Sequence, residues 1–170
     1  IDQRIAVCKQ FMADFEANKD AIATSVTAQM GKPYGQSCGE VGTVIERATA
    51  MIGMAKEQLA DAEMTEKDGF FRKIAKEPVG VVLTIAPWNY PLACAINSVI
   101  PAVLAGNTVV LKHSSRTPLC SEHIADAFDS ASESVLGMKG VVTSLQCGHG
   151  QVAKAISHDK VRSAARAAVV

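Results

Sequence analysis

Two polar residues stand at the ends of apolar, β-branched runs, a position from which side chains in an α/β protein can reach a ligand. Asn89 follows the run 81–85 inside a Pro-Trp-Asn-Tyr-Pro segment, and Lys112 ends the run 108–111. Such runs are typical of buried strands, and the prolines force a turn after the first of them. Open α/β sheets build their sites at the carboxyl ends of strands, so the amide of Asn89 is held where a site is expected.

Structural roles are the alternative for each of these residues. Asn89 suits the N-cap of a following helix, and Lys112 suits a solvated strand terminus. Ser114, Ser115 and Thr117 would be turn and cap residues in the same sense. From the residue types alone, the N-cap is the commoner use of an asparagine at such a position.

Strands and helices alternate from residue 80 onward, and this order indicates the fold class. The expected strands are 81–85, 108–111 and 140–145, and the expected helical segments are 90–99, a short turn from Pro101, a helix after Thr117-Pro118 and a helix around 152–156. Alternation of this kind implies parallel strands joined by crossovers. We predict an α/β fold, with N-terminal helices followed by a partial doubly wound, Rossmann-like parallel sheet.

The first 60 residues carry the apolar spacing of amphipathic helices. One apolar stripe runs through 5–22 and a second through 41–59, with a Gly-Lys-Pro-Tyr-Gly break at 31–35. We predict a helical hairpin over 1–60, a linker or short β-hairpin over 61–79, a βαβαβα dinucleotide-binding half over 80–161 and an atypical tail over 162–170.

Composition and motif content exclude several classes of protein. Acidic and basic residues are equal in number, so no charge excess favours nucleic acid or an anionic membrane. The chain begins at Ile1 without an apolar signal core, which indicates an internal cut or a processed end. Five scattered cysteines and four histidines show neither disulfide nor metal-ligand spacing. We therefore expect reduced thiols, no metal, and an intracellular location, in the cytoplasm or the mitochondrial matrix.

Two blocks of the chain resemble the aldehyde dehydrogenase superfamily. Residues 80–92, which include Ile-Ala-Pro-Trp-Asn-Tyr-Pro-Leu, are similar to that family's strand-to-helix turn, and 105–119 are similar to its next block. The G-x-G-x-x-G fingerprint of other dinucleotide-binding proteins does not occur. Weaker similarity extends over 29–33, Glu40-Val41 and 141–161.

The resemblance implies a chemistry and assigns residues to it. Members oxidise aldehydes to carboxylic acids with NAD or NADP, through a cysteine thiohemiacetal and a thioester that a glutamate-activated water hydrolyses. Asn89 would donate its side-chain amide to the tetrahedral oxyanion. Lys112 would hydrogen-bond the adenosine ribose. The other implied cofactor residues are Ile85, Ala86, Pro87, Trp88, His113, Ser114 and Ser115.

Two departures from the family pattern affect the cofactor turn. His113 stands where members usually have proline, which makes the turn less rigid. Ser115 stands where many NAD-preferring members have glutamate, a carboxylate that binds the ribose hydroxyls and repels a 2′-phosphate. We therefore expect NADP to be accepted as well as NAD.

The nucleophilic cysteine and the base glutamate have no counterpart in this sequence, since none of its cysteines lies in the family's nucleophile context. One interpretation is a part of a working NAD(P)-dependent aldehyde dehydrogenase, inactive when alone. The alternative is a truncated, inactive structural or assembly subunit, and a free-standing nucleotide-binding module is a weaker third. Expected partners are a small aldehyde and a homo-oligomer or other subunit. A sheet that stopped after three strands would leave an unpaired edge and favour aggregation.

Overall fold

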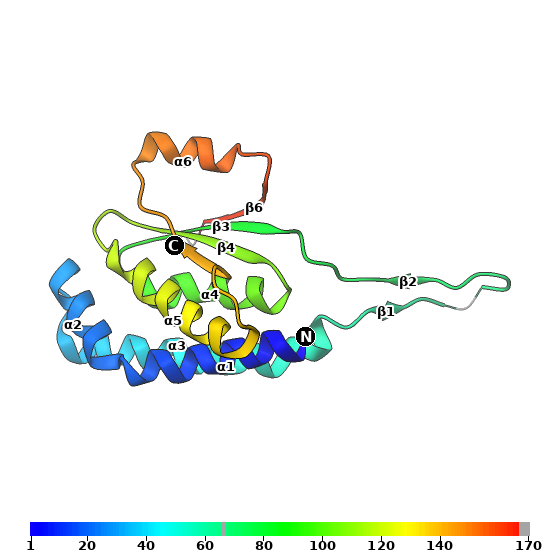
Figure 1. Ribbon diagram of the computed structural model, residues 1–170, viewed down its shortest axis with the longest axis horizontal. Coiled ribbons are helices and arrows are strands. Elements are labelled where there is room, and N and C mark those ends of the chain that lie inside the picture. The colour runs from blue at the N-terminus through cyan, green and yellow to red at the C-terminus, as the bar shows by residue number, and fades with distance from the viewer. Residues whose placement is uncertain (66, 167–170) are drawn as a thin grey trace.

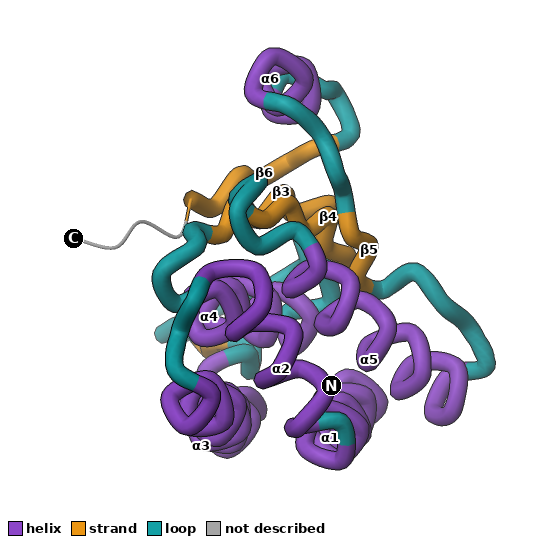
Figure 2. The backbone as a smooth tube through the Cα atoms, turned by 90° about the vertical axis from the view of Figure 1, so that its left-hand side faces the viewer, coloured by secondary structure: helices purple, strands orange, loops and turns teal. Residues whose placement is uncertain are grey.

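The computed structural model describes residues 1–65 and 67–166, which form helices on both faces of a small parallel sheet (Figure 1). The helices are α1 (Asp2–Ala17), α2 (Lys19–Met30), α3 (Tyr34–Gln58), α4 (Pro91–Leu104), α5 (Leu119–Leu136) and α6 (His149–Ile156). The strands are β1 (Ala62–Glu63), β2 (Lys73–Ile74), β3 (Val81–Ala86), β4 (Thr108–His113), β5 (Val142–Ser144) and β6 (Val161–Arg166). Helices α4 and α5 cover one face of the sheet, with α1 and α3 beneath them, and α6 lies over the other face (Figure 2). This is the α/β, Rossmann-like fold expected from the alternation.

The main sheet has the strand order β5-β4-β3-β6, and all of its pairings are parallel. The prediction of an atypical tail over 162–170 is corrected, because residues 161–166 form β6 along the free edge of β3. The sheet therefore has four described strands and not three. The backbone of β3 gains a second set of hydrogen bonds that a three-stranded sheet would leave unmade. The last four residues of the predicted tail, 167–170, lie outside the described part of the chain.

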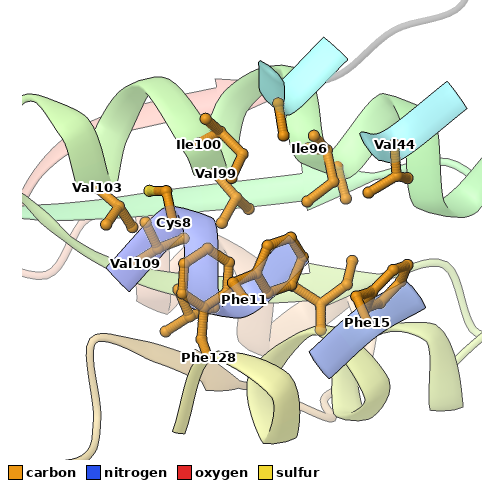
Figure 3. Close-up of a cluster of buried hydrophobic side chains, with 14 of the residues drawn as sticks. Cys8, Phe11, Phe15, Val44, Ile96, Val99, Ile100, Val103, Val109 and Phe128 are labelled. Atoms are coloured by element: carbon orange, nitrogen blue, oxygen red, sulfur yellow. The ribbon is translucent and has the colours of Figure 1, made fainter. Parts of the chain in front are cut away.

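The hydrophobic core lies between the sheet and the helices α1, α3, α4 and α5. Phe11 of α1 stacks on Phe128 of α5 with ring centroids 4.1 Å apart, and Phe15 lies 5.2 Å from Phe11 (Figure 3). All three rings are fully buried. Burying a side chain of this size contributes about 1.5–3 kcal/mol, so this cluster ties the N-terminal helix to the sheet. Strands β3 and β4 are thereby held on a rigid base.

The N-terminal region contains three helices, and the prediction of two was wrong. The first apolar stripe is interrupted at Asn18, where α1 ends and α2 begins. The side-chain amide of Asn18 donates to the carbonyl of Asp14 at 2.8 Å, an acceptor that the backbone N–H of Asn18 also uses at 3.3 Å, so the side chain competes with the helical bond at this point. The second break, at Gly31, was predicted, and this glycine has the left-handed φ of 76°.

Helix α4 runs through Pro101, where the sequence indicated a new turn. A proline lacks the N–H that an internal helical position donates. The helix continues because its next residues, Ala102, Val103 and Leu104, are buried in the core, while Pro101 itself faces solvent. Packing of the apolar face outweighs one missing hydrogen bond.

Residues 61–79 contain a β-hairpin, one of the two alternatives considered for that segment. Ala62 pairs with Ile74 and Glu63 with Lys73, in antiparallel register. The hairpin extends well away from the rest of the molecule (Figure 1). Its side chains include Phe70 and Phe71, which are 65% and 91% exposed. None of the helices in the described residues is long and apolar enough to cross a membrane.

Candidate functional site

The carboxyl ends of β3 and β4 bring the predicted site residues together at one edge of the sheet. Ile85 is the register partner of Lys112, and Ala86 is the partner of His113. Ala86 belongs to the core beneath the sheet. Because successive side chains of a strand point to opposite faces, Ile85 and Lys112 lie on the face that α6 covers. Lys112 is only 5% exposed, so its ammonium group lies in a largely enclosed position.

His113 lies on the helical face of the sheet, and its predicted cofactor role does not fit that position. Its ring is buried, and Nε2 lies 2.8 Å from the carbonyl oxygen of Pro91, to which the N–H form donates. Burial lowers the pKa of His113 to about 4, against the raising effect of the Pro91 hydrogen bond. A neutral His113 therefore joins the end of β4 to the start of α4. The alternation of side chains along β4 separates it from Lys112.

Asn89 is not the N-cap of α4, so the commoner interpretation of this residue was wrong. Tyr90 is the N-cap residue, and its side chain makes no hydrogen bond with the first turn of the helix. The Oδ1 atom of Asn89 is buried and has no hydrogen-bond partner among the described residues. The N–H₂ end of the same amide is the donor that an oxyanion would require.

The turn after β3 and the turn after β4 contact each other through an aromatic ring and a cation. The guanidinium carbon of Arg116 lies 5.0 Å from the ring centroid of Trp88, within the range of a cation–π interaction. The backbone N–H of Ser114 donates to Ala86, at 3.0 Å, and Ser115 is exposed beside them. Arg116 was missed by the sequence analysis, although it lies inside the block that carried the resemblance.

A surface hollow of about 700 Å³ lies close to Asn89, because the next residue, Tyr90, is one of its lining residues. Tyr90, together with Ala93 and Cys94 of α4, lines one side of it, and Glu40 and Arg47 of α3 line the other. Cys94 is only partly buried. Burial, and then the charge of Glu40, raise the pKa of its thiol. This thiol is therefore a poor nucleophile at neutral pH.

The other buried cysteines are also unreactive. Burial raises the pKa of Cys8 and of Cys120 to about 12. Both thiols are packed in the core. The described residues contain no group of three or more metal-ligating side chains placed to hold an ion.

Fold and site together define a class of protein. It is a Rossmann-like domain with polar groups at the ends of two adjacent parallel strands. Comparison with known proteins gives the family. The model of the aldehyde dehydrogenase family matches residues 1–165. The chain belongs to the aldehyde dehydrogenase family.

Curated relatives include two semialdehyde dehydrogenases. N-succinylglutamate 5-semialdehyde dehydrogenase 1 of Caulobacter vibrioides is 29% identical over 154 residues, which are 91% of this chain and 31% of that protein. A probable NADP(+) succinate-semialdehyde dehydrogenase of Synechocystis sp. is 36% identical over 116 residues, 68% of this chain and 25% of that protein. The chain thus spans about a third or less of the length of these relatives.

Solved structures of related enzymes share the fold. Succinic semialdehyde dehydrogenase from Streptococcus pyogenes, in complex with NADP+, superposes with a TM-score of 0.85 at 27% identity, over 96% of this chain and 35% of that one. PnpE in complex with nicotinamide adenine dinucleotide gives a TM-score of 0.85 at 27% identity, over 96% of this chain and 33% of that one.

Proposed function

We propose that this chain is the cofactor-binding and oxyanion-stabilising part of an NAD(P)-dependent enzyme that oxidises an aldehyde to a carboxylic acid. The observation that carries the proposal is the pair of strand ends: Asn89 follows β3 with its amide oxygen enclosed, and Lys112 ends β4 on the face opposite the core. Membership of the aldehyde dehydrogenase family supports it.

The residues at these strand ends fit a dinucleotide. Among the described residues, Lys112 has no carboxylate partner and is nearly buried, so its ammonium protons are available to ribose hydroxyls. Ile85 lies beside it, and the main chain at Ala86 and Pro87 leads to the exposed ring of Trp88. A bound nicotinamide would supply the hydride acceptor. We leave His113 out of this set, because its ring faces the opposite side of the sheet.

Both NAD and NADP are proposed as cofactors. Ser115 carries no charge that would repel a 2′-phosphate, and Ser114 precedes it in the same turn. Arg116, exposed next to Ser115, adds a cation within reach of that turn. The Synechocystis relative is named for NADP(+), and the Streptococcus pyogenes structure contains NADP+.

Asn89 would stabilise the negative charge that develops on the aldehyde oxygen when a thiolate attacks the carbonyl carbon. A preorganised donor of this kind is worth about 3–4 kcal/mol in the transition state. We assign the nucleophile and the general base to no residue of this chain. The raised pKa of the Cys94 thiol argues against that nearby group.

The exposed hairpin favours a second role, in association of subunits. Phe70, Phe71 and Ile74 are each more than half exposed on an arm that extends from the body. Apolar groups gathered in this way mark protein interaction sites. We propose that the arm contacts another copy of the chain, or another subunit, and this role is also what an inactive assembly subunit would retain.

The test is aldehyde-dependent reduction of NAD+ or NADP+ by the intact protein that carries this sequence. Replacing Asn89 by Ala should lower kcat by about 100- to 1,000-fold, because the oxyanion loses its donor. Gln3→Ala, which removes an exposed amide on α1, is the control and should leave kcat unchanged. Absence of turnover in the parent protein would support the assembly role and contradict the enzymatic one.

A further inference from the structure

We propose that Gln29 and Glu40 are positioning residues that hold the two site turns from outside the sheet, and this inference rests on the proposed function. Each of them reaches from the helical layer to the first turn of a sheet helix. The two side chains, together with Lys32, are called the clamp below.

Glu40 caps α4 from a distance of 52 residues along the chain. Its Oε1 accepts the backbone N–H of Leu92 at 2.8 Å and that of Ala93 at 3.1 Å. These are orphan donors of the first helical turn, and the carboxylate also complements the positive end of the helix dipole. Tyr90, the N-cap residue itself, supplies no such bond. The helix that begins just after Asn89 is therefore anchored by α3.

Lys32 extends this anchor to Tyr90. Its ammonium pairs with Oε2 of Glu40, and the two side chains are only 7% and 2% exposed. The same ammonium lies 4.3 Å from the ring centroid of Tyr90, the residue after Asn89. Ion pairs in such enclosed positions need good geometry to offset desolvation. One buried pair thus contacts Tyr90 and the first turn of α4, the residues that directly follow Asn89.

Gln29 caps the start of α5 with its neutral side-chain amide. Its Oε1 accepts the backbone N–H of Leu119 at 2.9 Å, and its Nε2 donates to the hydroxyl of Ser25 at 3.0 Å. Pro118 is the N-cap residue of α5 and has no side-chain acceptor of its own. The turn that contains Ser115 therefore ends on a contact with α2.

The two contacts predict separate kinetic effects. Glu40 holds the turn that carries the oxyanion donor, so its loss should lower kcat. Gln29 holds the cofactor turn, so its loss should raise the KM for NAD(P). A displacement of about 1 Å at a catalytic group costs about 100-fold in rate, which sets the scale for Glu40.

The kinetic test is a double-mutant cycle in the intact protein. Glu40→Ala should lower kcat by about 10- to 100-fold, and it should have almost no further effect when Asn89 is already Ala, because Glu40 acts through Asn89. Gln29→Ala should raise the cofactor KM several-fold with kcat little changed. Glu46→Ala, an exposed carboxylate on the same helix as Glu40, should change neither value. Multiplicative losses in the Asn89→Ala background would overturn the positioning role.

Amide hydrogen exchange tests the clamp without reference to activity. Glu40→Ala should accelerate exchange of the peptide that spans Leu92 and Ala93, and Gln29→Ala that of the peptide spanning Leu119. The combination Glu40→Gln with Lys32→Met removes both charges, keeps one acceptor, and should restore slow exchange. Unchanged exchange in Glu40→Ala and Gln29→Ala would overturn the clamp. An inactive parent with the predicted exchange would contradict the proposed function alone.

Discussion

The turns after β3 and β4 lie side by side at one sheet edge, yet they are held by different means. The first, at 87–90, begins with Pro87 and is followed by Pro91, and it is anchored by the charged pair of Lys32 and Glu40. The second, at 114–118, contains two serines and is anchored by the neutral amide of Gln29. We infer that Asn89 in the first turn serves the chemical step and that the second turn serves the choice of cofactor.

Breaking the charged anchor should have the largest effect on stability. Lys32→Met leaves the buried carboxylate of Glu40 without its cation and should lower the free energy of unfolding by about 3–5 kcal/mol. Urea denaturation of the intact protein measures this change. The matched control is Lys139→Met, because the Lys139–Glu133 pair is exposed and should contribute little to stability. Equal losses in the two variants would contradict a special role for the buried pair.

Acid should lower the stability of the fold through His113, which joins the end of β4 to the start of α4. Its pKa is lowered by burial from 6.5 to about 4 in the folded state. Between these values the unfolded chain binds a proton that the folded chain excludes, so stability is intact above pH 6.5 and falls toward pH 4. The loss should reach about 3 kcal/mol.

Denaturation at a series of pH values checks this effect. His113→Gln keeps a donor for the Pro91 carbonyl and should remove that part of the pH dependence. His158→Gln, at an exposed histidine, should retain it. A pH profile of His113→Gln identical to that of the parent would show that His113 is not the titrating group.

Introducing a carboxylate into the second turn, at Ser115, should change the preference between NAD and NADP. Ser115→Glu places a negative charge where a 2′-phosphate would lie, so kcat/KM for NADP should fall by about tenfold or more while NAD is used as before. Steady-state kinetics with both cofactors measure the ratio. Ser115→Gln, of similar size but uncharged, is the control. An equal loss with both cofactors would indicate a packing effect.

The contact between the turns should give the smallest effect. Arg116→Ala removes the cation from the Trp88 ring, an exposed interaction worth about 0.5–1 kcal/mol. The expected result is a cofactor KM raised about two- to fivefold, with Arg116→Lys in between. A change in kcat instead would contradict a role of Arg116 in cofactor binding.

The sequence was sufficient for elements whose residue types are distinctive. The β-branched runs at 81–85 and 108–111 predicted β3 and β4 because their apolar side chains need burial on both faces. Residues 162–166 lack such a run, being rich in alanine, serine and arginine, and their strand depends on the free edge of β3. Local patterns cannot show an edge that tertiary structure creates.

The candidate site was predictable residue by residue only along the two matching blocks. The period-2 alternation that turns His113 away from Lys112 can be read from the sequence. The departure from proline at position 113, however, indicated an effect on the rigidity of the turn and not on the direction of the side chain. Gln29 and Glu40 lay in segments of weaker resemblance and received no role. Their partners are 90 and 52 residues away, a separation that no local spacing encodes.

The central claim is the division between a catalytic role for Asn89 after β3 and a cofactor role for Lys112 at the end of β4, and one kinetic comparison tests it directly. Asn89→Ala and Lys112→Met are measured side by side in the intact protein, with aldehyde and NAD(P) varied separately. We predict that Asn89→Ala lowers kcat by about 100-fold or more with the cofactor KM little changed. Lys112→Met should raise the cofactor KM by about tenfold with kcat little changed. The same pattern of kcat and KM in both variants would contradict the account.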